Sequence, residues 1–241
     1  MNARTVAQLF KLELDEMFNR WEAGKPLRSG APHASAILAP ESEWCLRRHV
    51  LTALYPELVE RPDVKPWSAH TNAVFLNGWV LHEKWQKLFS GHGQVVEVEH
   101  SHFDEVRYLH FTPDAIISFG GSTYVVEIKG YKNSTFEKLN EAGKPPQAAH
   151  HQCNLYCHML EIERGIVLVE NKDTQEYKVW AIECDKDLAK PYLDRMYQVK
   201  GAVATRSTPA KVCASCTEHR AEKCPVKKLC FSGKLKEKES L

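Results

Sequence analysis

Two neighbouring segments decide the fold: TPDAIISF at residues 112–119 and YVVEIKG at residues 124–130. Both are rich in β-branched and aromatic residues, and the GGS between them is typical of a hairpin turn. Side chains alternate across a strand, so Glu127 and Lys129 share one face and their apolar neighbours share the other. An antiparallel partner strand can bring Asp114, near its start, beside Glu127.

This arrangement indicates a site for a divalent cation, because two carboxylates so close together repel each other unless a cation neutralises them. Hard oxygen ligands favour Mg²⁺ or Mn²⁺. Such an ion lowers the pKa of a bound water and stabilises the charge on a phosphoryl oxygen. Lys129 would orient or help deprotonate that water and offset the phosphate's charge. The alternative is a solvated strand edge, which the Pro113-Asp114 pair one hairpin upstream disfavours.

Hydrophobic periodicity outside this hairpin predicts an α/β protein with a mixed sheet flanked by helices. The predicted helices are 6–22, 41–54, 72–89, 147–162 and 185–203. The predicted strands are 94–103, 108–119, 123–130, 165–169 and 177–182. The charged segment with Gly and Pro between 131 and 146 is expected to be a loop.

Pro113-Asp114, followed after twelve residues by Glu127-Ile128-Lys129, resembles the PD-(D/E)xK nuclease signature. GWVLH at 78–82 resembles the helix that brings a histidine to the metal in the RecB-like branch, and QCNLY at 152–156 resembles its Q-x3-Y motif. The resemblance implies a restriction-endonuclease-like core. It implies catalytic roles for His82, Asp114, Glu127, Lys129, Gln152 and Tyr156, and metal ligation by His82, Asp114, Glu127 and the backbone carbonyl of Ile128.

Four cysteines crowd the tail, namely Cys213, Cys216, Cys224 and Cys230. In a reduced cytosolic protein this spacing indicates a metal, and a tetrahedral zinc site is the simplest form. Scattered free thiols are the alternative. The tail is also basic, with nine Lys and Arg against four Asp and Glu from Thr205 onward, although the whole chain carries a net charge of only +1.

Cys45, in WCLRR at 44–48, adds a fifth cysteine before the core. This segment resembles the N-terminal cysteine segment of iron–sulfur RecB-like nucleases. These include the CRISPR-adaptation nuclease family (the fourth Cas protein) and the AddB nuclease domain. In those, one cysteine before the core and three after it hold a [4Fe–4S] cluster. The tail departs from their usual Cys-x2-Cys-x5-Cys spacing. Cys45, Cys224 and Cys230 are the expected ligands, with Cys216 preferred over Cys213, and zinc on the four tail cysteines remains the alternative.

The composition and charge exclude a histone-like, disordered or membrane-spanning protein. The amphipathic start is not that of a signal peptide, so a cytoplasmic protein of a bacterial, archaeal or phage-infected cell is expected. Three regions are predicted: a helical region with the first cluster cysteine over 1–70, the nuclease core over 71–204 and the basic cysteine segment over 205–241.

By resemblance, the function is a metal-dependent deoxyribonuclease in recombination or CRISPR adaptation, most often an exonuclease on single-stranded DNA or DNA ends. The alternatives are a structure-specific endonuclease and a non-catalytic DNA-binding adaptor with a zinc site. No phosphate-loop motif is visible, so unwinding would need a helicase partner. CRISPR-adaptation partner proteins and a homo-oligomer are also compatible. Candidate phosphate contacts are Arg47, Arg48, Lys132, Lys144, Lys227 and Lys228.

Overall fold

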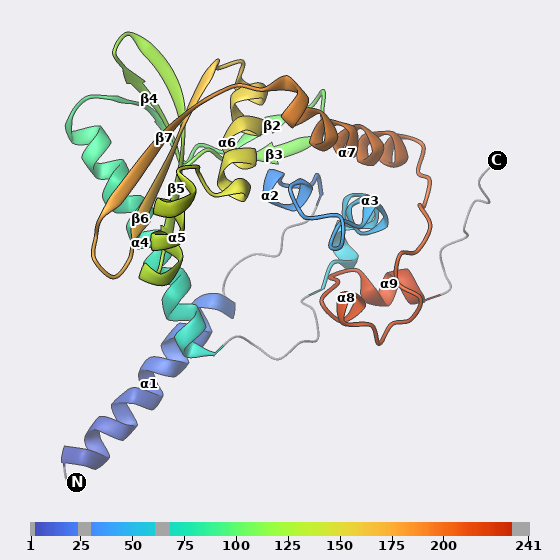
Figure 1. Ribbon diagram of the computed structural model, residues 1–241. Coiled ribbons are helices and arrows are strands. Elements are labelled where there is room, and N and C mark those ends of the chain that lie inside the picture. The colour runs from blue at the N-terminus through green and yellow to red at the C-terminus, as the bar shows by residue number, and fades with distance from the viewer. Residues whose placement is uncertain (1–2, 24–29, 61–67, 233–241) are drawn as a thin grey trace.

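A five-stranded mixed sheet forms the centre of the computed structural model, which describes residues 3–23, 30–60 and 68–232 (Figure 1). The strand order is β1-β4-β5-β6-β7, where β5 and β6 are parallel and the other neighbouring pairs are antiparallel. The five strands are β1 (Val95–Val98), β4 (Ala115–Phe119), β5 (Ser122–Tyr131), β6 (Arg164–Asn171) and β7 (Tyr177–Glu183). A separate ribbon pairs β2 (His102–Asp104) with β3 (Leu109–Phe111).

Helices cover both faces of this sheet (Figure 1). On one face lies α4 (Ala69–Gly91), which buries Leu81 and Trp85 against the sheet. On the other face lie α5 (Asn133–Ala142) and α6 (Gln147–Leu160), with α7 (Lys186–Ala204) packed on α6. The remaining helices are α1 (Ala3–Ala23), which packs on α4, α2 (Ala34–Ile37), α3 (Leu46–Leu54), a 3₁₀ turn (Pro56–Leu58), α8 (His219–Glu222) and α9 (Lys227–Phe231).

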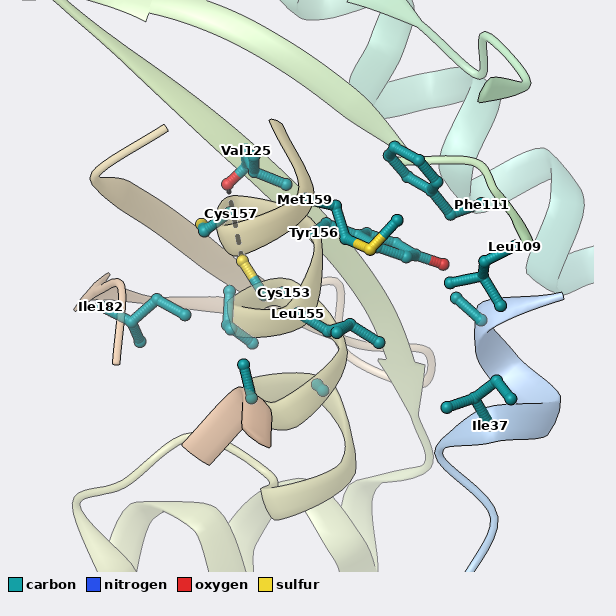
Figure 2. Close-up of a cluster of buried hydrophobic side chains, with 14 of the residues drawn as sticks. Ile37, Leu109, Phe111, Val125, Cys153, Leu155, Tyr156, Cys157, Met159 and Ile182 are labelled. Atoms are coloured by element: carbon teal, nitrogen blue, oxygen red, sulfur yellow. Dashed lines mark hydrogen bonds between the residues drawn. The ribbon is translucent and has the colours of Figure 1, made fainter. Parts of the chain in front are cut away.

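The larger hydrophobic core lies between α6 and the sheet (Figure 2). Cys153, Tyr156 and Cys157 of α6 are completely buried there, and the Cys153 thiol lies 3.6 Å from the carbonyl oxygen of Val125. Both sulfur atoms sit above Gly165 of β6, which has no side chain to exclude them. The cysteines of α6 therefore act as packing residues of the core.

The predicted fold class is confirmed, but two of the predicted strands each divide into two. The segment 94–103 breaks at Glu99, whose φ of 42° lies in the left-handed region and turns the chain out of β1. The segment 108–119 breaks at Pro113, which has no N–H to give to a strand ladder. As a result β2 and β3 form their own ribbon beside α2, and β1 and β4 stay in the main sheet.

The prediction of a loop between 131 and 146 is wrong, because α5 occupies most of it. Phe136 is almost completely buried in the core and holds this polar helix against the sheet. Asp173 accepts a hydrogen bond from the Asn133 N–H at the helix start, and Gly143 ends the helix with a φ of 62°. Leu139 packs against the same core, and two large apolar residues in ten are too weak a periodic signal to be read from the sequence.

The division into regions 1–70, 71–204 and 205–241 stays a prediction. Residues 24–29, 61–67 and 233–241 lie outside the described part of the chain. Within the described part, no helix combines the length and the apolar character needed to cross a bilayer.

Gly165→Ala is expected to destabilise the fold. A Cβ there would lie 2.5 Å from the Cys153 sulfur and 2.9 Å from the Cys157 sulfur. Overpacking of this kind costs about 1–3 kcal/mol of unfolding free energy, measurable by urea denaturation. Gly201→Ala in α7 is the matched control, because its Cβ would meet nothing within 4 Å, and it should leave stability equal or higher. Equal stability of the two variants would contradict the packing argument.

Candidate active site

Asp114 lies beside Glu127, as the hairpin register requires. Ala115 of β4 pairs with Val126 of β5. Because the two strands are antiparallel, Asp114, one residue before Ala115, lies opposite Glu127, one residue after Val126. The Asp114 side chain also continues the pairing, because its Oδ2 accepts a hydrogen bond of 2.7 Å from the Ile128 N–H. The carboxylate is thereby held at the end of the β4–β5 ladder, where the strand itself can no longer supply an acceptor.

Glu127 is completely buried, and its carboxylate meets the ammonium group of Lys129 on the same strand face. Although the two groups form an ion pair, neither oxygen of Glu127 accepts a well-oriented hydrogen bond from any described residue. A buried carboxylate with unused lone pairs is costly. This group is therefore suited to a further cationic ligand.

The environment shifts the pKa values of this pair upward. Burial raises the pKa of Glu127 to about 8, the nearby Asp114 charge adds to the shift, and Lys129 opposes it. Burial lowers the pKa of Lys129, but the charges of Glu127 and Asp114 outweigh that effect and raise it overall. Lys129 is therefore a cation at neutral pH, with 31% of its side chain accessible to a substrate.

Gln152 and Tyr156 of α6 approach the same centre from above the sheet. The Gln152 side-chain amide donates to the Tyr156 hydroxyl over 3.2 Å. Burial raises the pKa of Tyr156, and the charges of Glu127 and Asp114 raise it further. The structure thus brings both motif residues to the side of the sheet that carries Glu127, with the tyrosine as a neutral hydroxyl.

His82 reaches the site from α4, with Nδ1 3.4 Å from Asp114 Oδ1. Burial lowers its pKa, but the hydrogen bond and charge of Asp114 outweigh this and raise the pKa overall. Two further residues, which the sequence did not reveal, meet here. Glu99 Oε1 lies 3.8 Å from His82 Nδ1, and Gln86 donates both to Glu99 and to the Asp114 carbonyl. Glu99 directly follows β1, and Val98 of β1 pairs with Ala115 of the antiparallel β4. Glu99 therefore lies close to Asp114, and this can be seen only once the strand register is known.

His82, Asp114 and Glu127 are not gathered around one point. Over residues 3–23, 30–60 and 68–232, no group of three or more His, Cys, Asp or Glu side chains is arranged to hold a metal ion. Instead, His82 turns to Asp114 and Lys129 turns to Glu127. The expected ligand set is present in one neighbourhood, but its side chains contact each other.

A second group of candidate residues surrounds a small enclosed hollow of about 20 Å³ between α3, α9 and the segment that joins α7 to α9. Cys45, Cys213, Cys224 and Cys230 all line it, as free thiols. Burial raises the pKa of Cys224, and the charges of Cys45 and Cys230 add to the shift. Cys216 is exposed and does not line the hollow, so the geometry favours Cys213 where the sequence favoured Cys216.

Direct contacts hold the two distant segments around this hollow together (Figure 1). Arg47 donates to the Pro209 carbonyl over 2.6 Å, and Arg220 donates to the Trp44 carbonyl. Lys228 forms an ion pair of 2.7 Å with Glu60. Because Arg47 is only 1% exposed, its prediction as a phosphate contact is wrong, since its charge is used inside the protein.

Comparison with models of known protein families gives no match, and none of the curated proteins matches either. Solved structures do match. The crystal structure of SSO0001 aligns with a TM-score of 0.50 and 16% identity over 93% of this chain and 97% of that one. An alkaline exonuclease (LHK-Exo) from Laribacter hongkongensis aligns with a TM-score of 0.53 and 12% identity. The same enzyme in complex with dAMP aligns with a TM-score of 0.55 and 16% identity. Both LHK-Exo alignments cover 73% of this chain and 89% of the LHK-Exo chain. At these identities the likeness establishes the fold, which is restriction-endonuclease-like.

Glu127→Gln is expected to stabilise the metal-free protein at alkaline pH. The raised pKa means that protonated Glu127 stabilises the fold fully below pH 4.5, and that this contribution is lost as the pH rises through about 8. The glutamine is neutral throughout, so its melting temperature should exceed that of the wild type at about pH 9 and converge with it toward about pH 5. Thermal unfolding in chelator across this range measures the difference. A constant difference at every pH would contradict the assigned pKa.

Proposed function

We propose that this chain is a metal-dependent DNA nuclease, most simply an exonuclease acting on single strands or DNA ends. The observation that carries the proposal is the buried Glu127 beside Asp114 and Lys129 on a restriction-endonuclease-like sheet. The likeness to an alkaline exonuclease, which has been crystallised with dAMP, supports DNA as the substrate. By the sequence resemblance, the role extends to recombination or CRISPR adaptation.

Asp114 and Glu127 would hold Mg²⁺ or Mn²⁺, with His82 and the Ile128 carbonyl as further ligands. Glu127 Oε1 already meets Lys129, so Oε2, which accepts no hydrogen bond from a described residue, is the oxygen that fits such an ion. Mg²⁺ is bound by only one or two carboxylates and completes its shell with water and substrate phosphate, so a gathering of three side chains is not required. When bound, the ion supplies a more acidic water and stabilises charge on a phosphoryl oxygen.

The protein's own residues supply position and charge. Lys129 is held protonated by its two acidic neighbours, so it acts on the phosphate as a cation and orients the attacking water as a hydrogen-bond donor. Tyr156 keeps its proton and is completely buried, so its hydroxyl can support the site only from within. Gln152, which donates to that hydroxyl and is partly exposed, can also donate a hydrogen bond to the DNA backbone. His82 orients Asp114 through their shared contact.

The four cysteines around the enclosed hollow would hold a [4Fe–4S] cluster, with Cys45, Cys213, Cys224 and Cys230 as ligands. Four free cysteines lining one hollow are, by residue type, a donor set that suits iron–sulfur or zinc. In their present positions these four are not gathered around a single point, so their side chains would have to turn inward to bind a metal. Because Cys45 lines the same hollow as the three tail cysteines, an iron–sulfur cluster is favoured over a zinc ion bound by the tail cysteines alone. Thiols with raised pKa values must lose their protons to bind it, which makes loading dependent on pH.

Lys129→Ala and Glu127→Gln should each lower Mn²⁺-dependent cleavage of end-labelled single-stranded DNA by about 100-fold or more. Each change removes a charge that the substrate or the ion must meet. Lys87→Ala on α4 is the matched control, because Lys87 is 76% exposed and forms an ion pair with Glu83, one turn earlier on its own helix. It should leave the rate unchanged. Full activity of either site variant, in folded protein, would reject the assigned site.

Product lengths on linear and circular DNA test the exonuclease form of the proposal. An exonuclease shortens linear strands stepwise and leaves circles intact, because it needs an end. Cleavage of circular DNA would instead indicate the structure-specific endonuclease.

Cys213→Ser and Cys216→Ser form a matched pair for the cluster. In anaerobically purified protein, Cys216→Ser should keep about four iron atoms per chain and Cys213→Ser should lose them. Iron analysis and visible absorption measure this. Iron loss in Cys216→Ser alone would restore the ligand set preferred from the sequence. If the protein instead contains zinc, and Cys45→Ser does not change its zinc content, a zinc site on the tail cysteines would replace the cluster.

A further inference from the structure

A hollow of about 430 Å³ lies apart from the candidate active site, between α2, α3 and the β2–β3 ribbon. Its size falls within the range of roughly 300–1,000 Å³ typical of small-ligand sites. The described residues that border it include Arg48, His49, Thr52, His33 and His110. None of them is Asp or Glu.

The charge of this hollow suits an anion. Arg48 is half-buried, and its guanidinium lies 3.2 Å from Nε2 of His49. Burial lowers the pKa of His49 to about 3, and the charges of Arg48 and Arg195 contribute, so the imidazole is neutral and can accept this hydrogen bond. His49 also stacks on Trp44 with ring centroids 4.7 Å apart, which fixes it in place. Arg48 is therefore directed by a neutral partner that is itself stacked on Trp44.

Aromatic rings lead from the surface to the same hollow. Phe103, 45% exposed, has its ring centroid 4.5 Å from that of His110 and 6.0 Å from that of Tyr108. His110 in turn pairs with His33 through an isolated β-bridge, and both border the hollow. A row of flat rings beside a cationic group is the arrangement on which unpaired bases stack in single-strand-binding proteins.

The hollow is also close to the candidate active site along the chain. His110 belongs to β3, four residues before Asp114, which is a span of at most about 14 Å even in extended chain. Lys200 of α7 binds the carbonyls of Glu105 and Val106 at the tip of the ribbon, with distances of 3.3 and 2.8 Å. The tip of the ribbon is thus tied to α7.

We infer that this hollow binds one nucleotide of a single DNA strand, with its phosphate on Arg48 and its base against His110. Arg48 supplies the charge and the rings supply the stacking surface. A base in a duplex must be unstacked and unpaired, which costs free energy, before it can enter a side pocket, so a base of a single strand enters more readily. The inference rests on the proposed nuclease function and deepens it, because it selects single strands as the substrate class and assigns residues outside the metal site.

The test measures binding without cleavage, by fluorescence anisotropy of a labelled oligodeoxythymidine with the full chain and no divalent metal. His110→Ala should weaken binding by roughly 5- to 100-fold, the range for a lost base–aromatic stack. His110→Phe keeps a ring and should bind close to wild type. Arg48→Ala should weaken binding and reduce the slope of log K against log salt by about 0.7, as loss of one single-strand phosphate contact does. Arg164→Ala, at the exposed start of β6, removes the same charge elsewhere and should change neither.

Wild-type binding by His110→Ala, or equally poor binding by both His110 variants, would overturn the inference. Since Arg48 also borders the cysteine hollow, the two His110 variants decide the outcome. Weak competition by free thymidine monophosphate is expected, and competition as strong as that of the oligonucleotide would assign the hollow to free nucleotides instead. A protein that cleaves DNA while all variants bind equally overturns this inference alone. One that binds as expected but never cleaves overturns the proposed function alone.

Discussion

The burial of one carboxylate in the middle of a sheet is the constraint around which this protein is organised. Glu127 has no exposed surface, and an ionised carboxylate in such a place is unfavourable unless opposite charge is near. Lys129 on the same strand face and His82 on α4 supply that charge on either side of the carboxylate pair. Helix α6 covers this side of the sheet with the buried Tyr156. The strand and α4 thus each carry one cationic group beside the buried acid.

The parts of the site that depend on strand period and hairpin register could be predicted from the sequence. Asp114, Glu127 and Lys129 fall together because alternation and the β4–β5 turn leave little choice. Glu99 and Gln86 could not be found, since their approach to Asp114 depends on a break after β1 and on the docking of α4. Helix α5 was missed for a similar reason, because tertiary packing of Phe136 and Leu139 outweighs a polar local sequence.

The cysteines show the same limit at longer range. Spacing alone could not choose between Cys213 and Cys216, because the choice depends on how the tail folds back on α3. Arg48 lies between the cysteine hollow and the larger hollow beside the ribbon, and Pro225, next to Cys224, borders the larger one. The two hollows therefore share a wall, so the shape of the second depends on the packing of the first.

The contacts between residues near Cys45 and those near Cys230 also have a consequence for biosynthesis. Arg47 and Trp44 precede their partners Pro209 and Arg220 by 162 and 176 residues, and Glu60 likewise precedes Lys228. These partners in the tail are therefore not yet made while the sheet is being translated. The sheet, with its own core between α6 and the strands, can form on the ribosome before the tail emerges. Closure of the cysteine module needs residues 213–230, so it follows translation of the sheet. Any metal cluster would be inserted into a polypeptide whose sheet is already folded.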